Sequence, residues 1–227
     1  MAQSTDAILS SWQANAQQWI ATIDSEELES RQLVTNQAII QAVLAYRPKT
    51  LLDVGCGEGW LSRALSEHGI RTLGIDAVSA LIDNARKKRS GEYEVASYQD
   101  LIQQKALSSG PFAGAVINFA LLDKDMTERV VPALVHYLQK SGLLFVQTLH
   151  PAVLSDGRPY QSGWRPGSWD GMKREFTQPY EWYFRTLQDW VALFSQSGYL
   201  IKEIREPLHP KTGQPASVIF VLQQNGT

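Results

Sequence analysis

The sequence contains one cysteine in 227 residues, so the chain cannot form an internal disulfide or build a cysteine-rich zinc site. No stretch approaches the roughly 20 consecutive apolar residues of a membrane-spanning helix, and the first residues lack a basic region followed by an apolar core. The net charge of −2 provides no electrostatic footprint for nucleic acid. These absences predict a cytoplasmic protein with no membrane or nucleic-acid partner.

The sequence also lacks internal repeats and any clear domain boundary, and its length suits one domain with a full core. The one concentrated basic run, residues 86–89, falls where a helix beginning near Ser79 is expected to end. Cations are favourable at a helix C-terminus, so this run indicates a solvated helix end more than a binding patch.

The most informative segment of the chain is a glycine-rich turn. Residues 50–54 are largely apolar and predict a buried parallel strand, and Gly55, Gly57 and Gly59 follow it at alternate positions. Residues 60–68 then carry apolar side chains at helical spacing. A strand, a glycine turn and a helix in this order let a ligand lie on bare backbone beside the helix N-terminus.

The spacing of these glycines opposes a dinucleotide site. The fingerprint of such a site places a third glycine at position 60, where this chain has Trp60, which is too bulky for close packing of the helix on the strand. A second apolar strand, residues 71–76, ends in Asp76 about twenty residues after the first glycine. An acid at this spacing can accept hydrogen bonds from both hydroxyls of a ribose.

The pattern D-x-G-x-G-x-G at residues 53–59, followed by a helix, a strand and Asp76, resembles motif I and its surroundings in class I S-adenosylmethionine-dependent methyltransferases. The resemblance implies a Rossmann-like three-layer α/β sandwich with a mostly parallel seven-stranded sheet whose last strand is antiparallel. It implies S-adenosylmethionine as methyl donor and S-adenosylhomocysteine as product. The cofactor-binding residues that it implies are Arg31, Asp53, Gly55, Cys56, Gly57, Gly59, Asp76, Ala77, Ser97, Tyr98, Asn118 and Phe119.

The remaining pattern agrees with that fold. Strands are expected at residues 93–96, 112–118, 143–149, 199–204 and 217–222, alternating with helices at 79–89, 127–139 and 186–197, which predicts a parallel sheet with right-handed crossovers. Two helices precede the sheet, the second capped by Asp24 or Ser25. We expect a single domain, residues 1–227, with an N-terminal helical cap at 1–48. Arg31 on the second helix is a candidate for the carboxylate of the cofactor.

Three positions depart from better-defined branches of the family. Ser97 stands where an acid often follows the third strand, and Tyr98 is expected either to pack on the adenine or to begin a helix. Asn118 is followed by Phe119 and lacks the two prolines found in enzymes that methylate exocyclic amines of bases. Cys56 lies in the glycine turn, so it is expected to be a buried residue and not the nucleophile of cytosine C5 chemistry.

Residues 150–180 are rich in proline, glycine and aromatic side chains and predict a lid, because disordered segments are poor in aromatics. Trp164 and Trp169 are candidates for contact with substrate or sulfonium. Tyr180 to Arg185 is expected to form a short strand, and Arg185 either binds an acidic substrate group or pairs with Glu206.

Histidine is the side chain whose pKa best suits a general base near neutral pH. His150, at the end of the fifth strand, is the first candidate, and His209, between the last two strands, is the second. The chemistry implied by the resemblance is methylation of a small-molecule acceptor on oxygen, nitrogen or carbon by in-line displacement. An RNA methyltransferase and a non-catalytic S-adenosylmethionine-binding protein are the alternatives, and a monomer or homodimer is expected.

Overall fold

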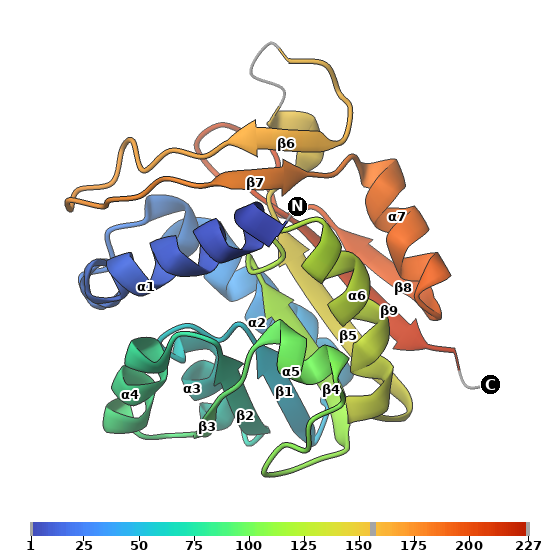
Figure 1. The fold of residues 1–227 in the computed structure, drawn as a ribbon. Helices are drawn as coiled ribbons and strands as arrows, with labels where there is room; N and C mark the ends of the chain where they lie inside the picture. Colours follow the sequence, from blue (N-terminus) through green and yellow to red (C-terminus); the bar gives the residue numbers. More distant parts are fainter. Residues whose placement is uncertain (1, 155–157, 226–227) are drawn as a thin grey trace.

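The computed structural model describes residues 2–154 and 158–225, and the side chains from residue 5 onward (Figure 1). The predicted lid therefore includes three positions, 155–157, that lie outside the described residues. No helix within the described ranges is long and apolar enough to cross a membrane.

The fold is built on a seven-stranded sheet in the order β3-β2-β1-β4-β5-β9-β8. Its strands are β1 (Thr50–Val54), β2 (Arg71–Asp76), β3 (Glu92–Val95), β4 (Phe112–Asn118), β5 (Leu138–Thr148), β8 (Tyr199–Arg205) and β9 (Val218–Gln224). The pairs among β1 to β5 are parallel, whereas β9 runs antiparallel to both β5 and β8. The predicted fold class is confirmed, including the reversed last strand.

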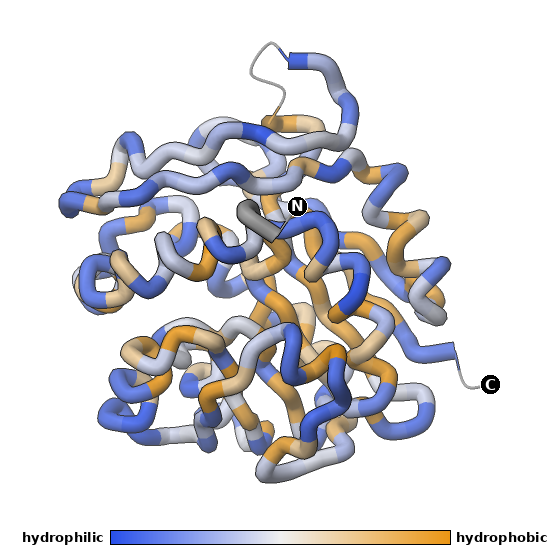
Figure 2. The backbone as a smooth tube through the Cα atoms, in the orientation of Figure 1, coloured by the Kyte–Doolittle hydropathy of each residue, from blue (hydrophilic) through white to orange (hydrophobic). Residues whose placement is uncertain are grey.

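Alternation of side chains along the central strands creates two cores. Leu52 and Val54 of β1 face one core, while Leu51, the residue before Leu52, faces the other. One core is closed by α5 (Tyr98–Ile102), α6 (Asp125–Ala133) and α7 (Leu187–Gln196), and the other by α2 (Asn36–Tyr46) and α3 (Trp60–Glu67). Apolar residues accordingly follow the strands and the inner faces of the helices in Figure 2.

The N-terminal helix α1 (Ala2–Asp24) crosses the carboxyl-end edge of the sheet below the lid (Figure 1). Ala16 and Ile20 bury its lower face against Val78 and Leu81, which begin α4 (Ser79–Lys88). Lys88 pairs with Asp24 at the end of α1 and with the buried Glu58 of the glycine turn. The helical cap is thus attached to the sheet next to that turn.

The second helix does not begin as predicted. Asp24 and Ser25 do not cap it, because α1 continues to Asp24 and a turn with Glu26 at φ 52° follows. A π-helical turn η1 (Arg31–Thr35) then leads into α2. A single π-helical turn has i→i+5 hydrogen bonds and is too short to produce a repeating pattern of apolar residues. The sequence therefore did not reveal where the second helix begins.

The predicted helix 127–139 is also too long. Pro132 lacks an N–H, and α6 ends at Ala133, one residue after it, passing into the 3-10 turn η2 (Leu134–Tyr137). Strand β5 therefore starts at Leu138, five residues before the predicted Leu143.

The lid is more ordered than its composition predicts. After the 3-10 turn η3 (Pro151–Val153), strand β6 (Gly163–Pro166) pairs antiparallel with β7 (Glu181–Phe184) in a separate two-stranded sheet. The four residues of β6 include glycine and proline, so no alternation marked them as a strand. This small sheet lies above α1 and the main sheet (Figure 1).

Candidate active site

The glycine turn has backbone angles that favour glycine at all three positions. Gly55, Gly57 and Gly59 have φ of 72°, 58° and 81°, in the left-handed region. The turn is held by β2, because the backbone N–H groups of Gly55 and Cys56 donate to the carbonyl of Ile75 at 2.8 and 2.9 Å. Its conformation is therefore set before any ligand arrives.

The three glycines are required for different reasons. A Cβ at Gly55 would lie 2.7 Å from the Cβ of Ala120, and one at Gly59 would lie 2.6 Å from the ring of Tyr93. A Cβ at Gly57 would meet only Trp19 within 4 Å, with Nε1 at 3.7 Å. Gly55 and Gly59 thus permit close packing, whereas Gly57 presents open backbone beside Trp19.

Asp76 lies directly against this open backbone. Its Oδ2 accepts from the N–H of Gly57 at 2.9 Å and its Oδ1 accepts from the N–H of Val78 at 2.8 Å. Burial raises the pKa of Asp76, and the hydrogen bonds from Val78 and Gly57 oppose that rise. Each carboxylate oxygen can accept a further bond, so the group can still receive ribose hydroxyls. Ala77, the next residue, is half-buried.

Asp53 and Cys56 lie behind the turn. The Asp53 carboxylate is 1% exposed and accepts from Ser62 Oγ at 2.7 Å, which joins β1 to α3. Burial raises the pKa of Asp53 to about 7, with the Ser62 hydrogen bond acting in the opposite direction. Burial also raises the pKa of the Cys56 thiol, which packs with Ile82 and Tyr93. The structure places both side chains inside the protein, where they support the turn.

Ser97 and Tyr98 begin the helix α5. The Ser97 hydroxyl donates to the Asp100 carboxylate at 2.7 Å and accepts from the Asp100 N–H, forming a capping box. The Tyr98 hydroxyl donates to the carbonyl of Ala120 at 2.9 Å, beside Gly55. Tyr98 thus borders the turn, and contact of Ser97 or Tyr98 with adenine stays a prediction.

Arg31 is brought to the same place by the π-helical turn. Its guanidinium lies over the ring of Trp60 at 4.9 Å and near Trp19 at 5.7 Å, while its Nε donates to Asn36 Oδ1 at 3.2 Å. Burial lowers the pKa of Arg31 to about 10, and the nearby Glu58 partly restores it. The side chain is still a cation at neutral pH and lies where a carboxylate above Gly57 could reach it.

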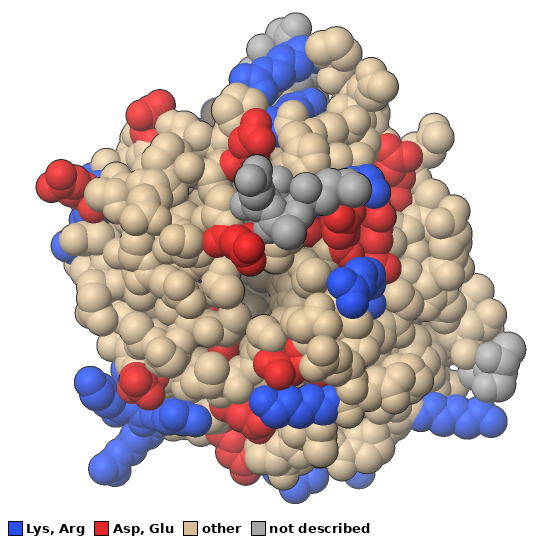
Figure 3. All heavy atoms as spheres, viewed as in Figure 1, with Lys and Arg blue, Asp and Glu red and all other residues tan. Residues whose placement is uncertain are grey.

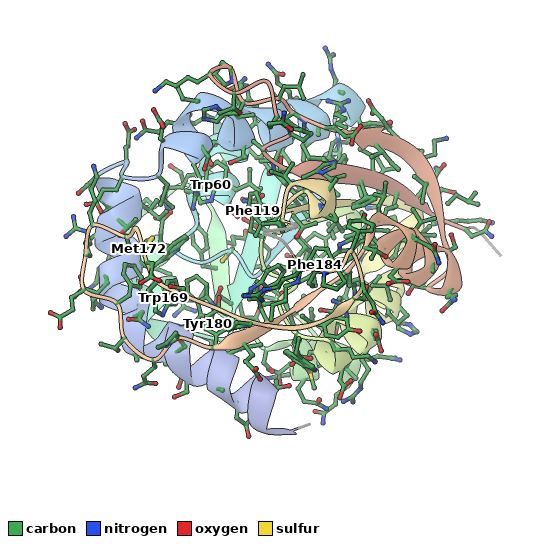
Figure 4. All side chains as sticks on the ribbon, turned by 90° about the horizontal axis from the view of Figure 1, so that it is seen from above. Trp60, Phe119, Trp169, Met172, Tyr180 and Phe184 are labelled. Atoms are coloured by element: carbon green, nitrogen blue, oxygen red, sulfur yellow. The ribbon has the colours of Figure 1, made fainter. Side chains whose placement is uncertain are left out.

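A cavity of about 300 Å³ is lined by residues of α1, the β4–α6 loop, the end of β5, the lid and α7, and the glycine turn is not part of this described lining. Figure 4 shows Phe119, Trp169, Tyr180 and Phe184 around it from above. Nine of its eighteen described lining residues are aromatic, namely Trp12, Trp19, Phe119, Trp169, Tyr180, Trp182, Tyr183, Phe184 and Trp190. Arg185 is the one charged residue in that described lining. The cavity suits a flat, mainly apolar molecule.

The predicted substrate residues have different positions. Trp169 lines the cavity, with its ring edge-on to Trp12 at 5.6 Å and stacked on Phe176 at 4.7 Å. Trp164 is outside this described lining, 37% exposed and edge-on to Tyr183. Asn118 ends β4, and its buried Oδ1 has no hydrogen-bond partner among the described residues. Phe119 follows with φ 54° and turns into the cavity.

Neither predicted base is among the described lining residues. His150 is 6% exposed, and its Nε2 lies 2.6 Å from Oε1 of Glu206. Because β5 ends at Thr148, it is Thr148 and Leu149 that face the cavity at this point. His209 lies in the β8–β9 connection, where its Nδ1 accepts from the N–H of Lys211 at 3.3 Å. A role for either histidine as base stays a prediction.

Arg185 does not pair with Glu206, whose recorded partner is His150. The Arg185 guanidinium donates to the carbonyls of Asp123 and Lys124, at 3.2 and 3.0 Å, and lies 3.6 Å from Glu128. Binding of an acidic substrate group by Arg185 stays a prediction.

Sequence reasoning missed several walls of the cavity. Trp12, Trp19 and Trp190 are not among the site residues that the sequence predicts. In the structure all three line the cavity. A tryptophan-rich stripe on a helix before the sheet is a weak signal for this role, since such stripes are usually core. Within the described residues no group of three or more His, Cys, Asp or Glu side chains could hold a metal ion.

Comparison with known proteins agrees with this geometry. Residues 51–142, from β1 into β5, match the model of a methyltransferase domain. The ubiquinone biosynthesis O-methyltransferase of Xylella fastidiosa is 34% identical over 105 residues, which are 44% of this chain and 42% of that protein. The chain thus spans less than half the length of this curated relative.

Two solved structures share the fold. A S-adenosylmethionine-dependent methyltransferase from Clostridium acetobutylicum superposes with a TM-score of 0.65 at 11% identity, covering 90% of this chain and 96% of that one. Magnesium protoporphyrin IX methyltransferase from Synechocystis, solved with bound S-adenosylhomocysteine, gives 0.57 at 16% identity, covering 83% and 81%. Residues 51–142 therefore resemble a methyltransferase domain, and the chain shares the fold of these S-adenosylmethionine-dependent methyltransferases.

Proposed function

We propose that the protein transfers the methyl group of S-adenosylmethionine to a small-molecule acceptor held in the aromatic cavity. One observation carries the proposal. Trp19 lies 3.7 Å from the position of a Cβ on Gly57 and also lines the cavity, so the open backbone and the cavity adjoin. A donor on the turn and an acceptor in the cavity would therefore be neighbours.

The residues around the turn fit such a donor. Asp76 would bind the ribose hydroxyls, Arg31 would bind the methionine carboxylate, and Gly57 would let the chain between them lie on bare backbone. Ser97 and Tyr98 would border the adenine, with Asn118 and Phe119 on the side of the acceptor. Asp53 and Cys56 would contribute through the turn that they support.

When bound, the sulfonium supplies an electrophilic methyl carbon, which the acceptor attacks in line, leaving S-adenosylhomocysteine. Such a displacement needs little covalent help from the protein, and alignment of the two reactants supplies up to roughly 7–11 kcal/mol in favourable cases. The lid and α1 would exclude water, and the faces of the cavity aromatics would favour the cationic sulfonium.

A small molecule fits better than RNA as acceptor. The cavity is narrow and mainly apolar, and Lys and Arg are scattered over the face seen in Figure 3 instead of forming one continuous surface. Binding of single-stranded nucleic acid needs a positively charged groove along the backbone.

Calorimetry with S-adenosylmethionine and S-adenosylhomocysteine tests the donor site, and transfer of a labelled methyl group to a set of phenols, amines and carboxylic acids tests the reaction, with RNA as control. We expect micromolar uptake of both nucleosides and transfer to a flat small molecule. Failure to bind either nucleoside would refute the proposal. Binding without transfer to any acceptor would favour a non-catalytic S-adenosylmethionine-binding protein. Transfer to RNA alone would favour an RNA methyltransferase.

A further inference from the structure

Arg185 is an unusual residue for the wall of this cavity. It is 4% exposed, and its guanidinium is held between two aromatic rings of the cavity, those of Tyr183 at 4.8 Å and Trp190 at 5.1 Å. Placing a cation among aromatic and aliphatic side chains costs free energy unless it is paired. The surroundings of Arg185 therefore indicate what it pairs with.

The hydrogen bonds of Arg185 go to neutral groups of the protein, the carbonyls of Asp123 and Lys124. Arg185 also forms an ion pair with Glu128 at 3.6 Å, but the Glu128 side chain is 41% exposed and is shared with Lys124, which lies closer at 2.9 Å. A half-exposed, shared carboxylate neutralises the charge of Arg185 only in part. The Asp123 carboxylate receives Thr5 Oγ1 and the N–H of Met126.

The position of Arg185 is fixed on two sides. The carbonyls of Asp123 and Lys124 lie just before α6, and Trp190 belongs to α7, so the guanidinium lies at the α6–α7 side of the cavity. Trp19 and the glycine turn lie at the side of α1 (Figure 1). A flat molecule anchored at Arg185 would extend across the aromatic walls toward the turn.

We infer that the acceptor is a planar, mainly apolar molecule with one anionic oxygen group, such as a carboxylate, and that Arg185 binds this group as a specificity determinant. The inference rests on the proposed function and adds the chemical class of its substrate. The anionic group acts as an anchor, and the methylated atom lies at the other end of the molecule, toward Gly57. Arg185 sets which acceptor binds and in which direction it lies.

Three naphthalene probes of equal shape test this class: naphthalene-2-carboxylate, naphthalene-2-carboxamide and 2-(aminomethyl)naphthalene. Binding is measured by quenching of tryptophan fluorescence in the full chain saturated with S-adenosylhomocysteine. A charge-assisted hydrogen bond is stronger than a neutral one, so we expect the carboxylate to bind about tenfold or more tightly than the carboxamide, and the amine to bind most weakly.

Arg185→Met removes the charge and retains an unbranched side chain, and we expect the carboxylate-to-carboxamide ratio to fall to about one. Glu128→Gln removes the acid that pairs with Arg185 and keeps Arg185, so the ratio should rise. Both variants are first checked for S-adenosylhomocysteine affinity, which also shows that they are folded. If Arg185→Met does not fold, the Glu128→Gln variant and the three probes on the unaltered protein decide the matter.

A purely structural role for Arg185 predicts no preference for the carboxylate in the unaltered protein and no change of the ratio in either variant, and that result would overturn the inference. Loss of S-adenosylhomocysteine binding in the unaltered protein would instead refute the proposed function. The two failures are therefore distinguishable in one set of titrations.

Discussion

The two sides of the candidate active site are built in different ways. The proposed donor side is formed mainly by backbone: the turn at residues 55–59, which donates hydrogen bonds to the Ile75 carbonyl of β2 and is met by the carboxylate of Asp76. The acceptor side is formed by side chains from α1, the β4–α6 loop, the lid and α7, which are far apart in the sequence. Backbone recognition depends little on side-chain identity, whereas a wall of side chains changes with each substitution. The difference teaches that the same sheet edge can keep its backbone site for the methyl donor while the side chains that would bind the methyl acceptor change.

The largest effect is expected for a substitution that blocks the donor site and leaves the acceptor cavity unchanged. Gly57→Val introduces a branched side chain at φ 58°, which costs about 1–2 kcal/mol, and places it beside Trp19 in the open space of the turn. We expect S-adenosylhomocysteine affinity, measured by calorimetry, to fall by about two orders of magnitude or more, which corresponds to roughly 3 kcal/mol.

Gly69→Val is the matched control for that variant. Gly69 also has positive φ, 80°, but a Cβ there would have no neighbour within 4 Å. This control should lose similar stability and keep its affinity. If Gly57→Val and Gly69→Val bind S-adenosylhomocysteine with equal affinity, the open backbone at Gly57 is not part of the donor site.

The second effect is on the acceptor side alone. Trp169→Ala removes one aromatic wall, and the lost apolar contact corresponds to roughly 1–2 kcal/mol. We expect KM for the acceptor to rise about tenfold or more while the Kd for S-adenosylhomocysteine stays within about twofold. Trp164→Ala, on the exposed side of the same lid, should leave both constants nearly unchanged. A parallel loss of donor affinity in Trp169→Ala would show that the two sides are not separable.

The third effect concerns the attachment of the lid to α1. Asn15 is 1% exposed, its Nδ2 donates to the carbonyl of Thr177 at 2.7 Å, and its Oδ1 accepts from the N–H of Thr177 at 2.8 Å. Asn15→Ala would remove both hydrogen bonds to Thr177, each of which contributes about 0.5–1.5 kcal/mol. We expect faster hydrogen exchange across residues 158–180 and a higher KM for the acceptor, with unchanged donor affinity.

Ser10→Ala is the control for the lid, because the Ser10 hydroxyl bonds Gln178 on the exposed surface at 3.2 Å. Exchange in the lid should change little in this variant. If Asn15→Ala behaves like Ser10→Ala, the lid is held by its aromatic packing and not by this pair of hydrogen bonds.

The last effect is on stability and depends on pH. The pKa of Asp53 is raised to about 7 in the folded protein by burial, so the folded state binds a proton that the unfolded state releases near pH 4. The associated stability is fully present below about pH 4 and is lost as pH rises through 7, with a slope of at most about 1.4 kcal/mol per pH unit.

Asp53→Asn removes this titration and keeps an oxygen that can accept from Ser62. Denaturant unfolding at pH 5 and pH 8 should therefore show a smaller loss of stability with rising pH in the variant than in the unaltered protein. An identical pH dependence would mean that Asp53 is ionised in the folded state throughout this range.

Much of the fold was predictable because its signals are local. The strands at residues 50–54, 71–76 and 112–118 have the bounds expected from their apolar runs, and Thr186 caps α7 as its side chain predicts. The errors lie where local signals compete. Pro132 and the π-helical turn at Arg31 altered helix lengths, and β6 carries glycine and proline within four residues.

The sequence by itself determined the geometry of the proposed donor side: three glycines at alternate positions after one strand and an acid after the next meet at the same sheet edge in any parallel α/β sheet. Only the tertiary structure decided the acceptor side. Contacts such as Trp12 with Trp169, or Arg185 with Asp123, join residues far apart along the chain, and their pairing depends on how helices and lid pack over the sheet. The same packing set His150 against Glu206, outside the described cavity lining, and brought Arg185 into it.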